Sequence, residues 1–185
     1  MAYLPDLSDY NYLAEFVRPG TKAVGWLDQE HDFQTGPSDE GALRALWEFC
    51  KISVAQTRGC HPCPFCRTQV GTEAQRDGQS LLLGTAEIRV FSPEGQVYAA
   101  PTLIYHYVAH HQYRPPVEFL TALLNGPRPG SPDYFALLRG VSLECNATPT
   151  GGQGYWDPSA YDPELDDQTP LIELMARSKQ TPSAR

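Results

Sequence analysis

The chain has 185 residues, enough for one domain that buries roughly 70% of its unfolded surface without a disulfide framework. A hydrophobic content of 41% excludes a wholly disordered chain, and no apolar run approaches the roughly 18 residues that span a bilayer. The net charge is −8 and the bases are scattered, so we expect neither nucleic acid nor a membrane as a partner. Acidic residues at the start, where a signal peptide carries bases, favour a cytoplasmic location.

The apolar pattern predicts an α+β fold, in which a small antiparallel sheet packs against three to four helices. In chain order we expect a strand within 22–27, a helix at 38–51, a strand at 52–55, a hairpin with strands at 86–91 and 96–100, and helices at 101–111, 116–124 and 132–139. Two of these predictions have a local cause. Ser38 is a suitable N-cap for the first helix, and Ser92-Pro-Glu-Gly95 has the residues of a type I turn.

The composition divides the chain into two parts. We expect residues 1–140 to form the domain and 141–185 to form a flexible, partly disordered tail, with a short helix near 169–178. The tail holds seven acids and three bases, so it is acidic by itself. Inside the domain, residues 58–79 are mostly polar, and burial alone would hardly order them.

The cysteines and histidines carry the strongest chemical pattern. Cys63-Pro-Phe-Cys66 is a C-x2-C knuckle, which lets two thiolates face one metal ion. A gap of 39 residues separates Cys66 from His106. His110 follows His106 at an i, i+4 spacing, so both imidazoles share one face of the predicted helix. A hairpin in the intervening segment would return this helix to the knuckle. Mixed Cys/His tetrahedral sites suit zinc better than copper or iron.

Several ligand sets are open. Cys63, Cys66, His106 and His110 form the first set, and His61 with both knuckle cysteines and one helical histidine forms the second. A third set replaces His61 by Cys60. His111 is the weakest candidate, because it lies about 100° away from His110 on an ideal helix. The remaining possibility is that the chain binds no metal, with its isolated cysteines acting as small core residues.

The sequence contains no recognisable catalytic template. The knuckle resembles the P-C-x-x-C half of zinc deaminases, but the required H-x-E is absent upstream. The loop-like flanks argue against a thioredoxin motif, and Cys145 is too distant to be the fourth ligand of an iron–sulfur cluster. We therefore expect a structural zinc site in a non-enzymatic binding or accessory protein whose partner is another protein. The alternative is a zinc-dependent hydrolase or transferase with three protein ligands and a free histidine as its acid–base group.

Separated motifs within about residues 1–125 resemble a family of short uncharacterised bacterial proteins. These motifs are Tyr3-Leu-Pro-Asp-Leu7, Val24-Gly-Trp-Leu-Asp28 with His31, Arg58-Gly-x-His61-x-Cys63-x2-Cys66, Gly84-x-Ala-Glu-Ile-Arg-Val90, Tyr98-Ala-Ala-Pro-x-Leu-Ile-Tyr-His-Tyr-Val108 with His110, and Tyr113-Arg-Pro-Pro116. The resemblance implies no activity. It does imply that His61, Cys63, Cys66, His106 and His110 belong to the shared pattern, whereas Cys60 is particular to this chain. Five candidates for four positions leave one histidine outside the coordination shell.

Overall fold

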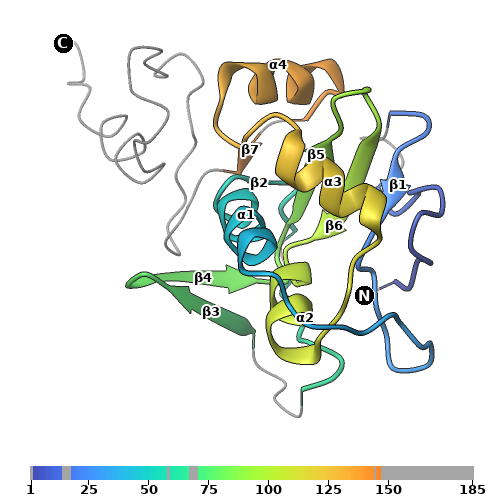
Figure 1. Ribbon diagram of the computed structural model, residues 1–185, viewed down its shortest axis with the longest axis vertical. Helices are drawn as coiled ribbons and strands as arrows, with labels where there is room; N and C mark the ends of the chain where they lie inside the picture. The colour runs from blue at the N-terminus through green and yellow to red at the C-terminus, as the bar shows by residue number, and fades with distance from the viewer. Residues whose placement is uncertain (1, 14–17, 58, 67–70, 144, 147–185) are drawn as a thin grey trace.

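A five-stranded sheet in the order β1-β6-β5-β2-β7 forms the centre of the molecule (Figure 1). The strands are β1 (Lys22–Ala23), β2 (Ser53–Val54), β5 (Glu87–Phe91), β6 (Val97–Pro101) and β7 (Cys145–Asn146). The computed structural model describes residues 2–13, 18–57, 59–66, 71–143 and 145–146. The α+β class is confirmed, but the sheet is mixed rather than antiparallel, because β1 pairs with β6 in parallel. The long connection between these strands allows this pairing, which a tight hairpin turn does not.

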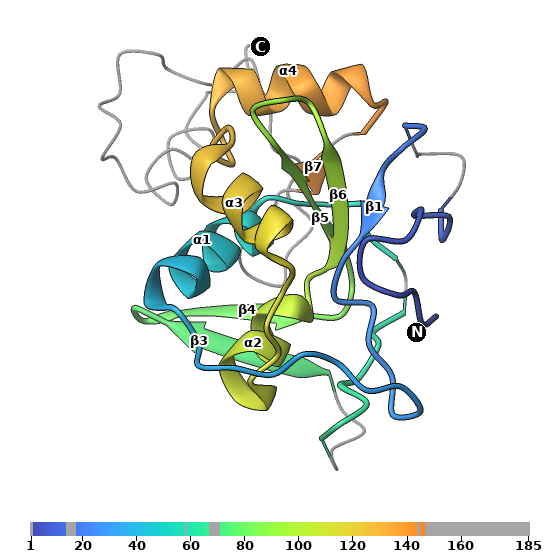
Figure 2. The same cartoon turned by 45° about the vertical axis from the view of Figure 1, so that its right-hand side comes forward.

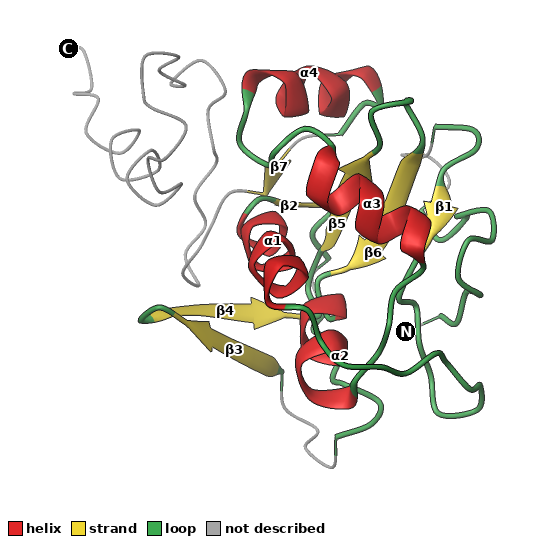
Figure 3. Ribbon diagram, viewed as in Figure 1, coloured by secondary structure: helices red, strands yellow, loops and turns green. Residues whose placement is uncertain are grey.

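The described residues contain four helices, which are α1 (Glu40–Lys51), α2 (Ile104–His111), α3 (Val117–Asn125) and α4 (Pro132–Gly140). Of these, α1, α3 and α4 contact the sheet through β5, and α2 packs against α1 (Figure 3). Helix α1 begins two residues later than predicted, because Asp39 rather than Ser38 caps it by accepting a hydrogen bond from the Ala42 amide at 2.8 Å. Ser38 instead donates to the Val108 carbonyl at 2.6 Å and so ties the start of α1 to α2.

The predicted hairpin is formed by β5 and β6, and every residue of both strands is buried. The alternation of apolar and polar residues in 86–91 instead predicts a strand with one exposed face. Helices α1, α3 and α4 contact β5, and the N-terminal arm (residues 2–13) reaches the hairpin, with Tyr10 donating to Glu87. Figure 2 shows this arm running beside β1 at the edge of the sheet. The arm therefore supplies burial that the strand pattern alone does not reveal.

A second, two-stranded sheet begins in the polar segment 58–79, for which the sequence predicts a loop, and its second strand continues to residue 83. Strands β3 (Thr72–Arg76) and β4 (Gln79–Leu83) form an antiparallel hairpin beside α1. Its turn is Asp77-Gly78, where both residues have positive φ angles, 49° and 74°. Asp-Gly is the favoured sequence for a two-residue hairpin turn. The prediction of a loop was therefore wrong from residue 72 onward, because Asp77-Gly78 closes a hairpin although the flanking residues are mostly polar.

The folded part continues past the predicted boundary at residue 140. Val141 and Leu143 are buried in the core, and β7 pairs with β2. The predicted helix near 169–178 and most of the predicted tail lie outside the described residues. Among the helices that the structure describes, none has the length and apolar character needed to cross a membrane.

Candidate metal centre

The knuckle loop, residues 59–66, is held by contacts on both sides. The His61 amide donates to the Gly84 carbonyl at 2.8 Å, and the Gln29 side chain donates to the Pro64 carbonyl. Phe65 packs its ring against Phe33, with centroids 5.2 Å apart. The loop therefore has an aromatic anchor between its two cysteines, and Cys63 is buried with 3% exposure.

Helix α2 supplies the facing side of the centre. Its first residues are buried and it packs against α1, which fixes the helix position. His106 is buried with 8% exposure, and His111 is the last residue of the helix. The ring of His111 also packs against Phe65, with centroids 5.2 Å apart. The two elements thus meet around the knuckle.

Four donor atoms converge at this junction, one each from Cys63, Cys66, His106 and His111, and all lie within 4.8 Å of one another. The two histidine Nε2 atoms are 3.2 Å apart. His111 Nε2 lies 3.3 Å from Cys63 Sγ and 3.5 Å from Cys66 Sγ, and His106 Nε2 lies 3.3 Å from Cys66 Sγ. The cysteines are free thiols rather than a disulfide.

These separations fit a tetrahedral coordination shell. Zn–N bonds of about 2.0–2.1 Å and Zn–S bonds of about 2.3 Å place neighbouring donors about 3.3 Å apart for two nitrogens and about 3.6 Å apart for nitrogen and sulfur. The observed distances lie close to these values. A group of two cysteines and two histidines could therefore hold one metal ion without rearrangement of the chain.

The histidine that completes the group is His111, in place of the predicted His110, which is exposed. The i, i+4 spacing does bring His106 and His110 together, with ring centroids 4.8 Å apart, but the centroids of His106 and His111 are also only 5.0 Å apart. Helix α2 ends at His111, where the Gln112 amide donates to the Tyr107 carbonyl five residues back and Gln112 has a φ of 54°. At this helix end the Nε2 atom of His111, rather than a nitrogen of His110, reaches the two thiols.

Two other candidates lie near the cluster but outside it. His61 is half-buried and faces a separate pocket, lined also by Glu87. Cys60 is exposed, and its Sγ lies 3.5 Å from the Leu83 carbonyl oxygen. The cluster thus contains three of the five residues predicted as ligands, and whether these residues bind metal remains a prediction.

The surroundings of the cluster change the acidity of its members. Burial raises the pKa of the Cys63 thiol to about 11, because the interior disfavours a thiolate. Burial, with help from the neighbouring His110 and His111, lowers the pKa of His106 to about 4. The imidazole of His106 is therefore neutral near pH 7, which is its ligand form. Only the thiols must lose protons to bind a cation.

Tyr107 lies beside the cluster, with its ring centroid 6.4 Å from those of His106 and His111. Its hydroxyl is buried and has no hydrogen-bond partner among the described residues, so it bonds to neither thiol of the cluster. Burial raises its pKa, and the nearby thiols of Cys63 and Cys66 raise it further. The Tyr107 ring therefore covers the cluster without contributing a hydrogen bond to it.

Comparison with known proteins assigns the chain to a family. Residues 2–124, about two-thirds of the chain, match the family described as domain of unknown function DUF7919. The chain belongs to this family. The DUF7919 match contains all four cluster residues and ends within α3, so α4 and β7 lie beyond it. No curated protein and no solved structure matches the chain.

Proposed function

We propose that this DUF7919 member is a zinc protein in which a structural ion, bound by Cys63, Cys66, His106 and His111, joins the knuckle loop to α2. The convergence of four protein donor atoms within 4.8 Å carries this proposal. Two sulfurs and two imidazole nitrogens in a tetrahedral set suit zinc best among the common divalent ions.

The same observation favours a structural ion over a catalytic one. A catalytic zinc keeps one coordination position open for water or substrate, whereas four protein ligands close the shell. The further histidine of α2, His110, is exposed and is not one of the four. We therefore propose a non-enzymatic binding or accessory role in preference to a zinc hydrolase or transferase. A protein partner is part of this proposal, supported only by the acidic charge of −8.

Zinc has a clear task in this position. Residues 59, 60 and 62 of the knuckle loop are exposed, and Phe65 is the one large apolar side chain that anchors it, so apolar burial orders the loop only in part. A structural zinc contributes on the order of 10 kcal/mol of apparent binding free energy, comparable to the stability of a whole domain. The ion would replace the hydrophobic contacts that the loop lacks.

Removal of the ion is the direct test of this function. A strong chelator should lower the melting temperature of the purified protein by about 10 °C or more, since 1 kcal/mol corresponds to about 2–4 °C at this size. Added zinc should restore the original value. The Cys50→Ala variant should respond in the same way, because Cys50 is buried away from the cluster, with Sγ 3.6 Å from the Thr102 carbonyl.

The matched variant Cys66→Ala should melt at the lower temperature from the start and should not respond to the chelator. A wild-type melting curve that is the same with and without chelator would contradict a structural zinc.

A further inference from the structure

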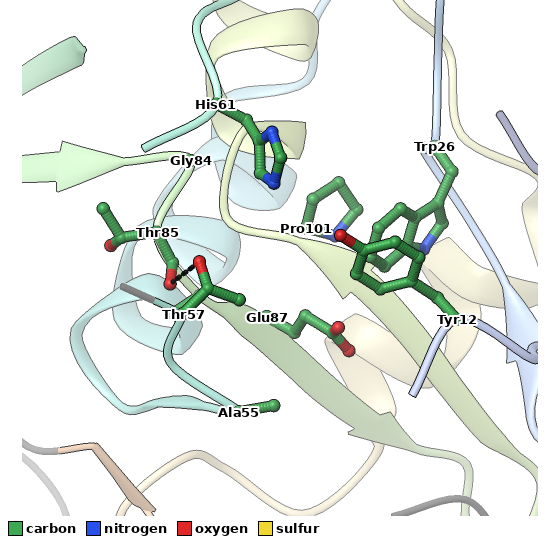
Figure 4. A pocket seen from close by; sticks show the side chains of 10 residues that line it. Tyr12, Trp26, Ala55, Thr57, His61, Gly84, Thr85, Glu87 and Pro101 are labelled. Carbon is green, nitrogen blue, oxygen red and sulfur yellow. Dashed lines mark hydrogen bonds between the residues drawn. The ribbon is translucent and has the colours of Figure 1, made fainter. Parts of the chain in front are cut away.

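A small pocket adjoins the knuckle loop, and the metal cluster makes no use of it. His61, Tyr12, Trp26, Pro101 and Glu87 face one another around it (Figure 4). Its volume is about 20 Å³, room for one water-sized group, and it opens to solvent. A pocket of this size takes the end of a ligand rather than a whole one.

Aromatic rings form one wall of this pocket. Tyr12 and Trp26 lie with ring centroids 4.9 Å apart and planes tilted by 44°. The Trp26 indole N–H already donates to the Ala99 carbonyl at 3.1 Å, so the ring offers the pocket its π system rather than a donor. The faces of such rings attract cations.

The floor of the pocket carries a buried carboxylate. Glu87 is only 3% exposed, and its oxygens accept hydrogen bonds from the Tyr10 hydroxyl at 2.7 and 2.8 Å and from Arg89 at 2.6 Å. A carboxylate has about four acceptor sites, so this one can accept more. In Figure 4 the carboxylate lies on the same side of the pocket as Tyr12.

The protein already binds one cation in this way. The Arg89 guanidinium lies 5.0 Å from the centroid of the Tyr10 ring and pairs with Glu87. Arg89 thus lies between the ring of Tyr10 and the carboxylate of Glu87, inside the protein. The pocket places the rings of Tyr12 and Trp26 near the same carboxylate, but it is open to solvent.

We propose that this pocket binds the ammonium end of an organic amine, with a carboxylate oxygen of Glu87 as its hydrogen-bond acceptor and the rings of Tyr12 and Trp26 as its walls. The carboxylate and the π faces both repel an anion, and a neutral donor can hydrogen-bond to the carboxylate but lacks the charge that strengthens both contacts. The size of the pocket admits the ammonium group and leaves the rest of the ligand outside. The ligand is a free amine or a lysine side chain, which share this chemistry.

The pocket rests on the proposed function in one respect, because the knuckle loop carries both the metal ligands and His61. The His61 amide is held by Gly84, and Cys63 follows two residues later. An ion that orders the loop also places His61 over the pocket. Amine binding should therefore weaken when zinc is removed.

The test is a titration of the zinc-loaded protein with n-butylammonium, n-butanol and butyrate, followed by NMR through the indole N–H of Trp26. We expect n-butylammonium alone to shift this signal in a saturable way. N-acetyl-lysine methylamide, added as a fourth probe, reports whether a lysine side chain also enters. Saturation by the free amine alone would identify a metabolite amine, and saturation by both would admit a protein ligand.

Tyr12 offers the variant pair that separates binding from folding. Tyr12→Phe keeps the ring and should bind n-butylammonium within about twofold of wild type, whereas Tyr12→Leu should bind about fivefold or more weakly. Tyr12 is half-buried on the N-terminal arm, so both variants should keep their zinc. Equal shifts from the alcohol and the amine, or equal affinities of the two variants, would overturn the amine pocket and leave the zinc proposal intact. Failure of the wild-type protein to retain zinc would instead overturn the zinc proposal.

Discussion

At the scale of single residues, the cluster shows how far spacing rules extend. The C-x2-C spacing identifies Cys63 and Cys66 because the geometry of a knuckle is local, and His106 follows from its place on the predicted helix. His111 could not be found in this way. On an ideal helix His111 lies about 100° from His110, and only the folded end of α2 shows that its Nε2 atom reaches the two thiols.

The two neighbouring histidines therefore make a sharp comparison. We expect His111→Gln to weaken zinc binding by about 100-fold or more, since loss of even an indirect support of a ligand costs about 10–100-fold. His110→Gln should leave the affinity nearly unchanged, because His110 is exposed. Competition with a chromophoric zinc chelator measures both affinities. The reverse order of effects would restore the set predicted from the sequence and contradict the structural assignment.

Asp6 anchors the N-terminal arm through a buried carboxyl group, whose hydrogen bonds and burial act on its pKa in opposite directions. Its carboxylate accepts a hydrogen bond from the Gly25 amide at 2.9 Å and from the Tyr113 hydroxyl at 2.8 Å. Burial nevertheless raises the pKa of Asp6 above 3.8, and these hydrogen bonds offset the rise only in part. The folded state therefore holds the proton more tightly than the unfolded state does.

This shift gives a pH dependence of known sign. A carboxyl group with a raised pKa favours folding most below about pH 4, and this contribution is lost as the pH rises through the folded pKa. The free energy of unfolding of wild type minus that of Asp6→Asn should therefore fall from about pH 4 to about pH 7. Urea denaturation of both proteins at matched zinc concentrations measures the difference. A difference that is flat or that rises with pH would refute this interpretation of Asp6.

At the scale of elements, prediction succeeded where the pattern is local. The β5–β6 hairpin and the helices α1 to α4 follow from apolar periodicity, turn residues and caps, and their bounds agree within a few residues. The parallel partner of β6 and the cover on the second face of β5 come from segments far away in the chain. The residues of β5 and β6 therefore do not indicate either feature by themselves.

Gly84 allows the knuckle loop to pack closely against the end of β4. It follows β4 with a φ of 83°, and a Cβ built there would lie 2.2 Å from the His61 carbonyl oxygen. The backbones of the knuckle loop and of β4 can approach this closely only because a side chain is missing.

Substitution of this glycine should separate the two elements. Gly84→Ala should lower the free energy of unfolding by about 3 kcal/mol or more, since backbone strain of about 1–2 kcal/mol adds to a clash with backbone atoms. Gly78→Ala is the matched control, with a φ of 74° and no atom within 4 Å of the built Cβ, so it should cost only the strain. Chemical denaturation compares them, and equal losses would show that the contact with His61 has no energetic weight.

At the scale of the whole molecule, the Cys/His cluster joins two segments that lie far apart in the sequence. The β5–β6 hairpin fills the interval between Cys66 and His106 and returns the chain to α2, as its predicted position required. The cluster, the amine pocket and the anchor of the N-terminal arm all lie within the segment that matches DUF7919.

X-ray absorption at the zinc edge of the purified, zinc-loaded protein tests the central claim most directly. The account predicts one ion per chain with a first shell of two sulfurs at about 2.3 Å and two nitrogens at about 2.0–2.1 Å. A shell that contains a water oxygen in place of one of these donors, or fewer than two sulfurs, would contradict it.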